Sequence, residues 1–164
     1  MSEESVKTTR KPLYTAEQRQ RRDSSRWTIV QGILAPLQFL AFAVSVLLVL
    51  RFLLSGDGYT AATVSILIKT VFLFVIMVTG AIWEKVVFGQ YLFAPAFFWE
   101  DVFSMAVLAL HTAYLLALFH SWLDTRGLML LALAAYATYV VNAAQFLLKL
   151  RAARLETGQA EAAA

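Results

Sequence analysis

Four long apolar segments constrain this chain more than any other feature of its sequence. Each reaches or exceeds the about 20 residues that a helix needs to cross the hydrocarbon layer of a membrane. Since 60% of the residues are hydrophobic and 15% are charged, the composition is also that of a membrane protein. The sequence therefore predicts an all-α fold, a polytopic antiparallel bundle of four transmembrane helices. The segments cover roughly residues 27–54, 60–83, 97–122 and 127–150.

The positive charges predict the orientation of these spans. Most of the 14 Lys and Arg residues precede the first span or follow the last one, whereas the two short turns at the opposite side carry Arg51 and Arg126. By the positive-inside rule, both termini should lie in the cytoplasm. The predicted regions are a cytoplasmic N-terminal arm (1–26), a four-helix transmembrane domain (27–150) and a cytoplasmic C-terminal tail (151–164).

The two ends of the chain are expected to be less ordered than the spans. Residues 1–14 should be disordered, and no signal peptide is expected before the first span. Thr15 and Gln18 have the spacing of a capping box, which predicts a short, basic, amphipathic helix on the membrane surface. The last helix should fray near Glu156, with a disordered tail after it.

The connection between the second and third spans differs from the other two. Residues 83–101, WEKVVFGQYLFAPAFFWED, are rich in aromatic side chains and carry charges only at their two ends. A free aqueous loop would be less apolar. We therefore expect a re-entrant or interfacial segment, although an ordinary belt of aromatic residues at the membrane interface would also explain its composition.

Polar residues of the spans gather in the cytoplasmic half of the predicted bundle. On the third span, Glu100, Ser104 and His111 follow one another at helical spacing, so they share one face. Because polar and ionisable groups inside a bilayer usually face a bundle interior or a cavity, we expect a polar pocket that opens to the cytoplasm. Lys69 is expected to reach toward the opposite interface. The other polar residues of the cytoplasmic half are Gln31, Gln38, Glu84, Lys85, Asp101, Asn142 and Gln145.

Each of these residues also has a purely structural explanation. Glu84 beside Lys85 can form an interfacial ion pair, and Glu100 can complement a helix dipole. Asn142 and Gln145 can link helices, and a lone His111 can be a structural hydrogen-bonding group. Because there is no cysteine, thiol catalysis and thiolate metal sites are excluded. The basic residues flank spans and do not form a nucleic-acid-binding surface.

Several stretches of the sequence together indicate a family, which composition alone does not. The stretches are LYTAEQRQRRD (13–23), GILAPLQFL (32–40), IMVTGAIWEKVVFGQYLFAPAFFWEDVFSM (76–105), ALHTAYL (109–115) and AAYATYVVNAAQFLLKLRAARLE (134–156). With them the sequence resembles, over nearly its whole length, the 3-vinyl bacteriochlorophyllide hydratase family of bacteriochlorophyll biosynthesis, also called the 2-vinyl bacteriochlorophyllide hydratase family.

The resemblance implies an enzyme that adds water to the 3-vinyl group of chlorophyllide a or 3-vinyl bacteriochlorophyllide a. The product is the 3-(1-hydroxyethyl) derivative. No cofactor is implied, because the Mg belongs to the tetrapyrrole substrate. The expected location is the bacterial inner (cytoplasmic or intracytoplasmic photosynthetic) membrane, with possible association with other bacteriochlorophyll-biosynthesis enzymes. A non-enzymatic tetrapyrrole-binding or photosystem assembly protein is the main alternative, and a transport subunit is a weaker one.

The resemblance carries no established catalytic residues, so the site is a hypothesis from chemistry. Protonation of a vinyl carbon needs a general acid, for which the candidates are Glu100, Asp101 and Glu84. Glu100 can share a proton with Asp101 or pair with Glu84 across the bundle. His111 is a possible axial ligand of the substrate Mg. The further candidates for substrate binding are Asn142, Gln145, Gln31, Lys85, Trp99, Phe98 and Tyr139, while Lys149 and Arg151 are candidates for meeting a substrate carboxylate.

Overall fold

The computed structural model describes residues 12–162 as five helices joined by short connections, with no strand in that range. Four of them are long and apolar enough to cross a membrane. The predicted all-α, four-span architecture with a short N-terminal helix is therefore confirmed. The helices are α1 (Ala16–Ser24), α2 (Arg26–Ser55), α3 (Tyr59–Phe88), α4 (Phe98–Phe119) and α5 (Thr125–Ala162).

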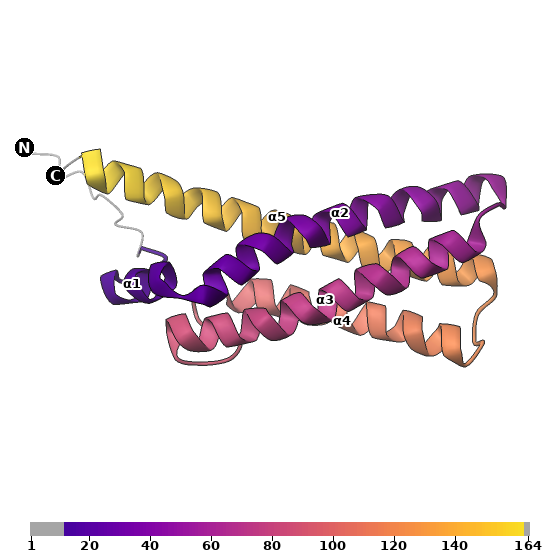
Figure 1. Cartoon of the computed structure of the whole chain (residues 1–164), viewed down its shortest axis with the longest axis horizontal. Coiled ribbons are helices and arrows are strands. Elements are labelled where there is room, and N and C mark those ends of the chain that lie inside the picture. The colour runs from indigo at the N-terminus through magenta and orange to yellow at the C-terminus, as the bar shows by residue number, and fades with distance from the viewer. Residues whose placement is uncertain (1–11, 163–164) are drawn as a thin grey trace, which may run out of the picture.

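The four long helices form two antiparallel hairpins, α2 with α3 and α4 with α5, which lie against each other in an elongated bundle (Figure 1). One end of the bundle, called the terminal end below, carries α1, the connection from α3 to α4 and the C-terminal part of α5. The connections from α2 to α3 and from α4 to α5 lie at the other end (Figure 1). The even number of spans thus brings α1 and the end of α5 to the same side.

Local sequence sets the helix boundaries. Thr15 and Gln18 form the predicted capping box at the start of α1, and the Ser25 side chain accepts a hydrogen bond from the Trp27 N–H at the start of α2. Gly56 and Gly58 adopt positive φ angles of 79° and 88° in the turn between α2 and α3. A side chain would be strained at both positions, so glycine permits this tight reversal.

The connection between α3 and α4 is shorter than expected. The bounds predicted for the re-entrant or interfacial segment, residues 83–101, are too wide, because α3 continues to Phe88 and α4 already begins at Phe98. Only residues 89–97 lie outside the two helices. Gly89 ends α3 at a φ of 88°, and Ala94 and Phe97 are buried against the bundle. The connection is therefore a turn that closes the terminal end.

Both chain ends are more ordered than expected where they are described. The expected fraying near Glu156 is wrong, since α5 continues to Ala162. Adding residues to an existing helix costs little free energy, and the added stretch is rich in Ala, Glu and Gln, which favour helix. Residues 1–11 lie outside the described residues, but Tyr14 is only 4% exposed and stacks on Phe88 at a ring-centroid distance of 5.8 Å. Disorder at residue 14 is therefore also wrong.

Candidate active site

Three buried carboxyl groups lie at the terminal end of the bundle. Glu84 comes from the end of α3, and Glu100 and Asp101 come from the first turn of α4; their residues are 5%, 5% and 3% exposed. The carboxyl groups of Glu84 and Asp101 are within hydrogen-bonding reach of each other. Neither pairing that the sequence suggested for Glu100 is the one observed. Adjacent residues project about 100° apart on a helix, so Asp101 reaches α3 while Glu100 reaches α5.

The turn between α3 and α4 holds the carboxyl pair through its backbone. The Phe93 N–H donates to Asp101 Oδ2 at 2.6 Å, and the Ala94 N–H donates to Glu84 Oε2 at 3.3 Å. Two successive N–H groups thus bind the two acids, one each. Phe93 has a φ of 60°, which is strained for a residue with a side chain and accompanies this N–H direction. The turn is built to position the pair.

Substitutions at Phe93 test this function of the turn. Phe93→Gly should keep turnover and leave stability unchanged or raise it by up to about 1 kcal/mol, because glycine adopts a positive φ without strain. Phe93→Val should cost about 1–3 kcal/mol and lower turnover, because a β-branched residue resists this conformation. Thermal unfolding in detergent and a vinyl-hydration assay check both. Equal behaviour of the two variants would contradict a requirement for the positive φ.

Glu100 is held by the last span. Lys149 of α5 forms an ion pair with Glu100 at 2.5 Å and also donates to the backbone carbonyl of Ala96 at 2.5 Å. The Lys149 side chain is 27% exposed, whereas that of Glu100 is 6% exposed. This ion pair neutralises the third acid and connects α5 to the start of α4. The sequence considered Lys149 only as a partner for a substrate carboxylate, and its use by Glu100 was missed.

Two other candidates at the terminal end have local partners. Gln31 of α2 donates to Thr79 of α3 at 2.7 Å, so it connects the first hairpin. Lys85 is exposed and donates to the Gly89 carbonyl at 2.7 Å, which satisfies the C-terminal end of α3. The suggested ion pair between Glu84 and Lys85 is not what the structure shows, because Glu84 points inward to Asp101.

A layer of uncharged polar groups lies one helical turn further into the bundle. Asn142 of α5 donates to Ser104 of α4 at 2.9 Å, and both residues are buried. Asn142 Oδ1 and Gln145 Oε1 are buried and have no hydrogen-bond partner among residues 12–162. The predicted polar faces of the third and fourth spans therefore do meet inside the bundle.

His111 and Lys69 form a second polar pair, nearer the middle of the bundle. The Lys69 amine lies 2.8 Å from His111 Nε2, and His111 Nδ1 lies 2.8 Å from the Val107 carbonyl. Because Lys69 is 0% exposed, the expectation that it reaches an interface is wrong. The Tyr139 ring lies 4.3 Å from the amine. Both ring nitrogens of His111 are thus engaged, and axial ligation of Mg would require Lys69 to move.

The three aromatic rings before the carboxyl groups have different environments. Phe97 is 2% exposed and stacks on Phe146 of α5 at 5.8 Å. Phe98 and Trp99 are 44% and 65% exposed, so they face outward from the bundle. The sequence singled out these two as substrate-binding candidates and missed Phe97. Burial could not be read from three consecutive aromatic residues.

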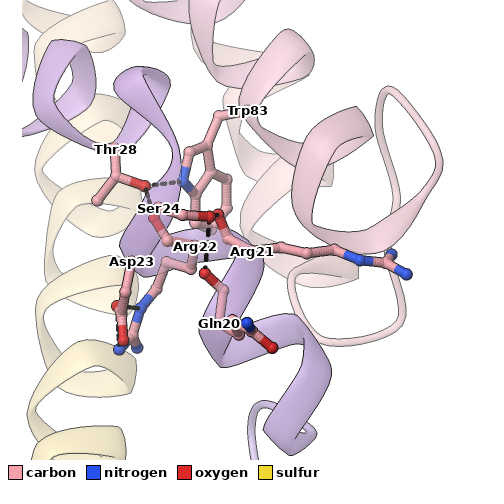
Figure 2. A network of polar contacts seen from close by, with 7 residues as sticks. All are labelled: Gln20, Arg21, Arg22, Asp23, Ser24, Thr28 and Trp83. Carbon is pink, nitrogen blue, oxygen red and sulfur yellow. Dashed lines mark hydrogen bonds and ion pairs between the residues drawn. The ribbon is translucent and has the colours of Figure 1, made fainter.

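Hydrogen bonds through Thr28 of α2 connect α1 to α3 directly beside Glu84. Trp83 donates to Thr28 at 3.0 Å, and Thr28 in turn donates to the Arg22 carbonyl at 2.6 Å (Figure 2). The Arg22 side chain bonds Asp23 at 2.7 Å and lies 4.8 Å from the Tyr14 ring (Figure 2 shows the contact with Asp23). The N-terminal arm therefore supports the helix end that carries Glu84.

An open cavity of about 480 Å³ beside α1 does not coincide with these groups. It lies on the surface, and the carboxyl pair is not part of its lining. Among residues 12–162, no group of three or more His, Cys, Asp or Glu side chains is arranged to hold a metal ion. The polar groups that the structure brings together at the terminal end are paired acids and amides. The cavity is lined by Pro12, Tyr14, Thr15, Ala16, Arg19, Gln20 and Asp23.

The fold and the site define a small four-span membrane protein with a buried carboxyl pair and an uncharged polar layer beside it. The chain belongs to the 2-vinyl bacteriochlorophyllide hydratase family, whose family model matches residues 14–152. The protein named 2-vinyl bacteriochlorophyllide hydratase in Rhodobacter capsulatus is 70% identical over 153 residues, which cover 93% of this chain and 89% of the relative. The protein of the same name in Cereibacter sphaeroides is 71% identical over 150 residues, which cover 91% and 92%. No solved structure matches the chain.

Proposed function

We propose that the Glu84–Asp101 pair is the acid–base centre with which this chain hydrates the vinyl group of a bacteriochlorophyllide. Membership of the family makes the chain a hydro-lyase of bacteriochlorophyll synthesis. The observation that carries the proposal is the arrangement of these two acids: both are buried, they lie within hydrogen-bonding reach, and each accepts a backbone N–H. Of the three acids considered, only these two form such a pair.

The reaction needs one proton donor and one proton acceptor. The terminal vinyl carbon gains a proton, the positive charge that develops on the ring-attached carbon is delocalised into the macrocycle, and a water oxygen bonds that carbon. The added water then loses one proton. Two acids this close in a buried site are most stable when they share a single proton. One member can therefore give the proton and the other can receive the proton of water.

The hydrogen bonds favour a particular assignment of roles. An N–H bond stabilises the charged form of a carboxyl group, and the bond to Asp101 is shorter than that to Glu84, at 2.6 Å against 3.3 Å. We therefore assign the proton to Glu84 and the charge to Asp101. Glu84 is the general acid toward the vinyl carbon, and Asp101 is the base toward water. Glu100, neutralised by Lys149, supports the pair without taking part.

The proposed substrate is a 3-vinyl tetrapyrrole, either chlorophyllide a or 3-vinyl bacteriochlorophyllide a, and the product is its 3-(1-hydroxyethyl) derivative. The reaction balances without an oxidant or a reductant, so we propose that no cofactor takes part and that the Mg is the substrate's own. The apolar helices provide a bilayer environment for such a flat, amphipathic pigment. Lys85 and Arg151, at the terminal end, are available to a substrate carboxylate.

The test is incubation of the detergent-solubilised protein with the vinyl pigment, followed by mass spectrometry and absorption spectroscopy. A hydratase gives a product that is heavier by one water and absorbs further to the blue. A protein that only binds or assembles tetrapyrroles leaves the mass unchanged. Substitutions at the carboxyl pair that abolish turnover and leave pigment binding intact would show that the reaction takes place at the proposed site.

The orientation of the chain is also a proposal. We propose the bacterial inner membrane with both termini in the cytoplasm, supported by the basic residues before α2 and at the end of α5. A reporter that is active only in the cytoplasm should be active when it is fused to the C-terminus. An inactive reporter would indicate the opposite orientation. The part of α5 that extends beyond the other three long helices (Figure 1) is available for association with other bacteriochlorophyll-biosynthesis enzymes, which co-purification would detect.

A further inference from the structure

Gln38 is a buried amide that the mechanism above leaves unused. It lies in α2, is 2% exposed, and neither its Nε2 nor its Oε1 has a hydrogen-bond partner among residues 12–162. A buried amide without partners costs several kcal/mol in an apolar setting. A bundle that retained such a group only for packing would be more stable with a Leu or Met there. The unpaired amide of Gln38 therefore indicates that a ligand binds there.

The pattern along α2 explains why Gln38 is left unpaired. Gln31, Gln38 and Ser45 recur every seven residues, so they share one face of the helix. Gln31 bonds Thr79 of α3, and Ser45 lies 2.8 Å from the hydroxyl of Ser65, also of α3. The α3 position between these two partners, opposite Gln38, is Phe72, which offers no hydrogen-bonding side chain. The first and last members of the stripe connect helices, whereas the middle member does not.

The register between α2 and α5 brings Gln38 to the uncharged polar layer. Ser45 lies 2.6 Å from the Tyr136 hydroxyl, and Phe42 lies 4.9 Å from the Tyr139 ring. These antiparallel pairs, continued by one helical turn toward the terminal end, place Gln38 at the level of Asn142. The same level holds Asn142 Oδ1, and Gln145 Oε1 lies one turn beyond it, both also without partners among the described residues.

The inventory of unpaired atoms identifies the kind of ligand. Gln38 offers one amide nitrogen, while Gln38, Asn142 and Gln145 together offer three carbonyl oxygens. The Asn142 nitrogen already donates to Ser104. A carbonyl or carboxylate of a pigment only accepts hydrogen bonds, so it would leave the three oxygens unsatisfied. A ligand with O–H groups, which donates as well as accepts, fits this set, and water is the smallest one.

We infer that Gln38 and Asn142 form a buried water subsite that supplies the oxygen atom added to the vinyl group. The inference rests on the proposed hydration at the Glu84–Asp101 pair and deepens it. Ser104, the partner of Asn142, follows Asp101 by three residues, which is about 5 Å along the helix axis. The subsite therefore lies about one helical turn further into the bundle than Asp101, the base that receives the proton of water. Gln38 acts as a positioning residue for the nucleophile.

Three variants test this role. Gln38→Met fills the site with a side chain of similar size and removes both polar atoms, so kcat should fall by about ten- to a hundredfold while KM stays within about threefold. Gln38→Ala leaves room for extra water, so it should retain more activity than Gln38→Met. Ser45→Ala, one heptad further along the same face, is the control: it removes a bonded hydroxyl, so it should lower the unfolding temperature and keep kcat within about twofold.

The outcomes separate this inference from its alternatives. A purely structural Gln38 predicts the reverse order, because the larger cavity of Gln38→Ala destabilises more than the filled site of Gln38→Met. That order, or a Gln38→Met variant with kcat within twofold of wild type, would overturn the inference. Side-chain amide NMR of the wild-type protein gives an independent readout: a water contact at the Gln38 NH₂ is expected, and its absence would also overturn the inference. Absence of any hydration by the wild-type protein would instead reject the proposed function.

Discussion

Asp101→Asn and Glu84→Gln are each expected to lower kcat for vinyl hydration by about 10²- to 10⁴-fold, while pigment binding is retained. Each change keeps the size of the side chain and an oxygen that can accept the N–H of the turn, but it removes the shared proton or the base. Because the two acids act as a unit, the double variant should be little slower than the slower single variant. Initial rates over a range of pigment concentrations, with binding followed by absorption, measure all three.

Two further acids provide the controls for this experiment. Glu17→Gln makes the same chemical change at an exposed ion pair with Arg21 in α1, and it should leave kcat unaltered. Glu100→Gln changes the third buried acid and should lose far less activity than either member of the pair. If Glu100→Gln abolished turnover while Asp101→Asn and Glu84→Gln remained active, Glu100 would be the acid and the assignment of the pair would be wrong.

Breaking the ion pair between Glu100 and Lys149 is expected to lower the stability of the bundle. Lys149→Met leaves a buried carboxylate without its cation, which should cost about 1–3 kcal/mol after allowance for the partial exposure of the lysine. Glu100→Gln removes the charge from the buried partner and should cost less. Thermal unfolding in a mild detergent, monitored by circular dichroism, measures both variants.

The double variant Glu100→Gln with Lys149→Met completes a double-mutant cycle. It should be more stable than the sum of the two single losses predicts, because no uncompensated buried charge is left. The exposed ion pair between Glu17 and Arg21 is the comparison, and Glu17→Gln should change stability by less than about 1 kcal/mol. Strictly additive losses in the cycle at Glu100 and Lys149 would show that α5 is held at the terminal end by other contacts.

Periodicity was sufficient to predict which faces of the helices are buried. Glu100, Ser104 and His111 follow one another at helical spacing, and the structure buries all three. The same arithmetic predicted the inward position of Asn142, which bonds Ser104. Helical spacing is a local property of the backbone, and a polar helix face inside a membrane usually faces the bundle interior. These residues could therefore be identified without a structure.

Helical spacing could not predict which side chains on different helices pair with each other. Glu84 pairs with Asp101, although the sequence suggested only pairs that include Glu100, and Lys69 bonds His111 although it was expected at an interface. Both pairs join α3 to α4, and their formation depends on how the two hairpins are rotated against each other. Rotation of one hairpin by the angle between adjacent residues would exchange Asp101 for Glu100 without altering any hydropathy pattern.

The sequence by itself determined the four spans, the common side of α1 and the end of α5, and the faces that lie inside, because these follow from helix period, membrane thickness and charge. Only the tertiary structure decided that a strained turn at Phe93 holds two acids together, that Lys149 neutralises the third, and that Gln38 has no hydrogen-bond partner among residues 12–162. The reason is physical: these features are contacts between side chains on different helices. They depend on distances of a few ångströms that no single segment encodes.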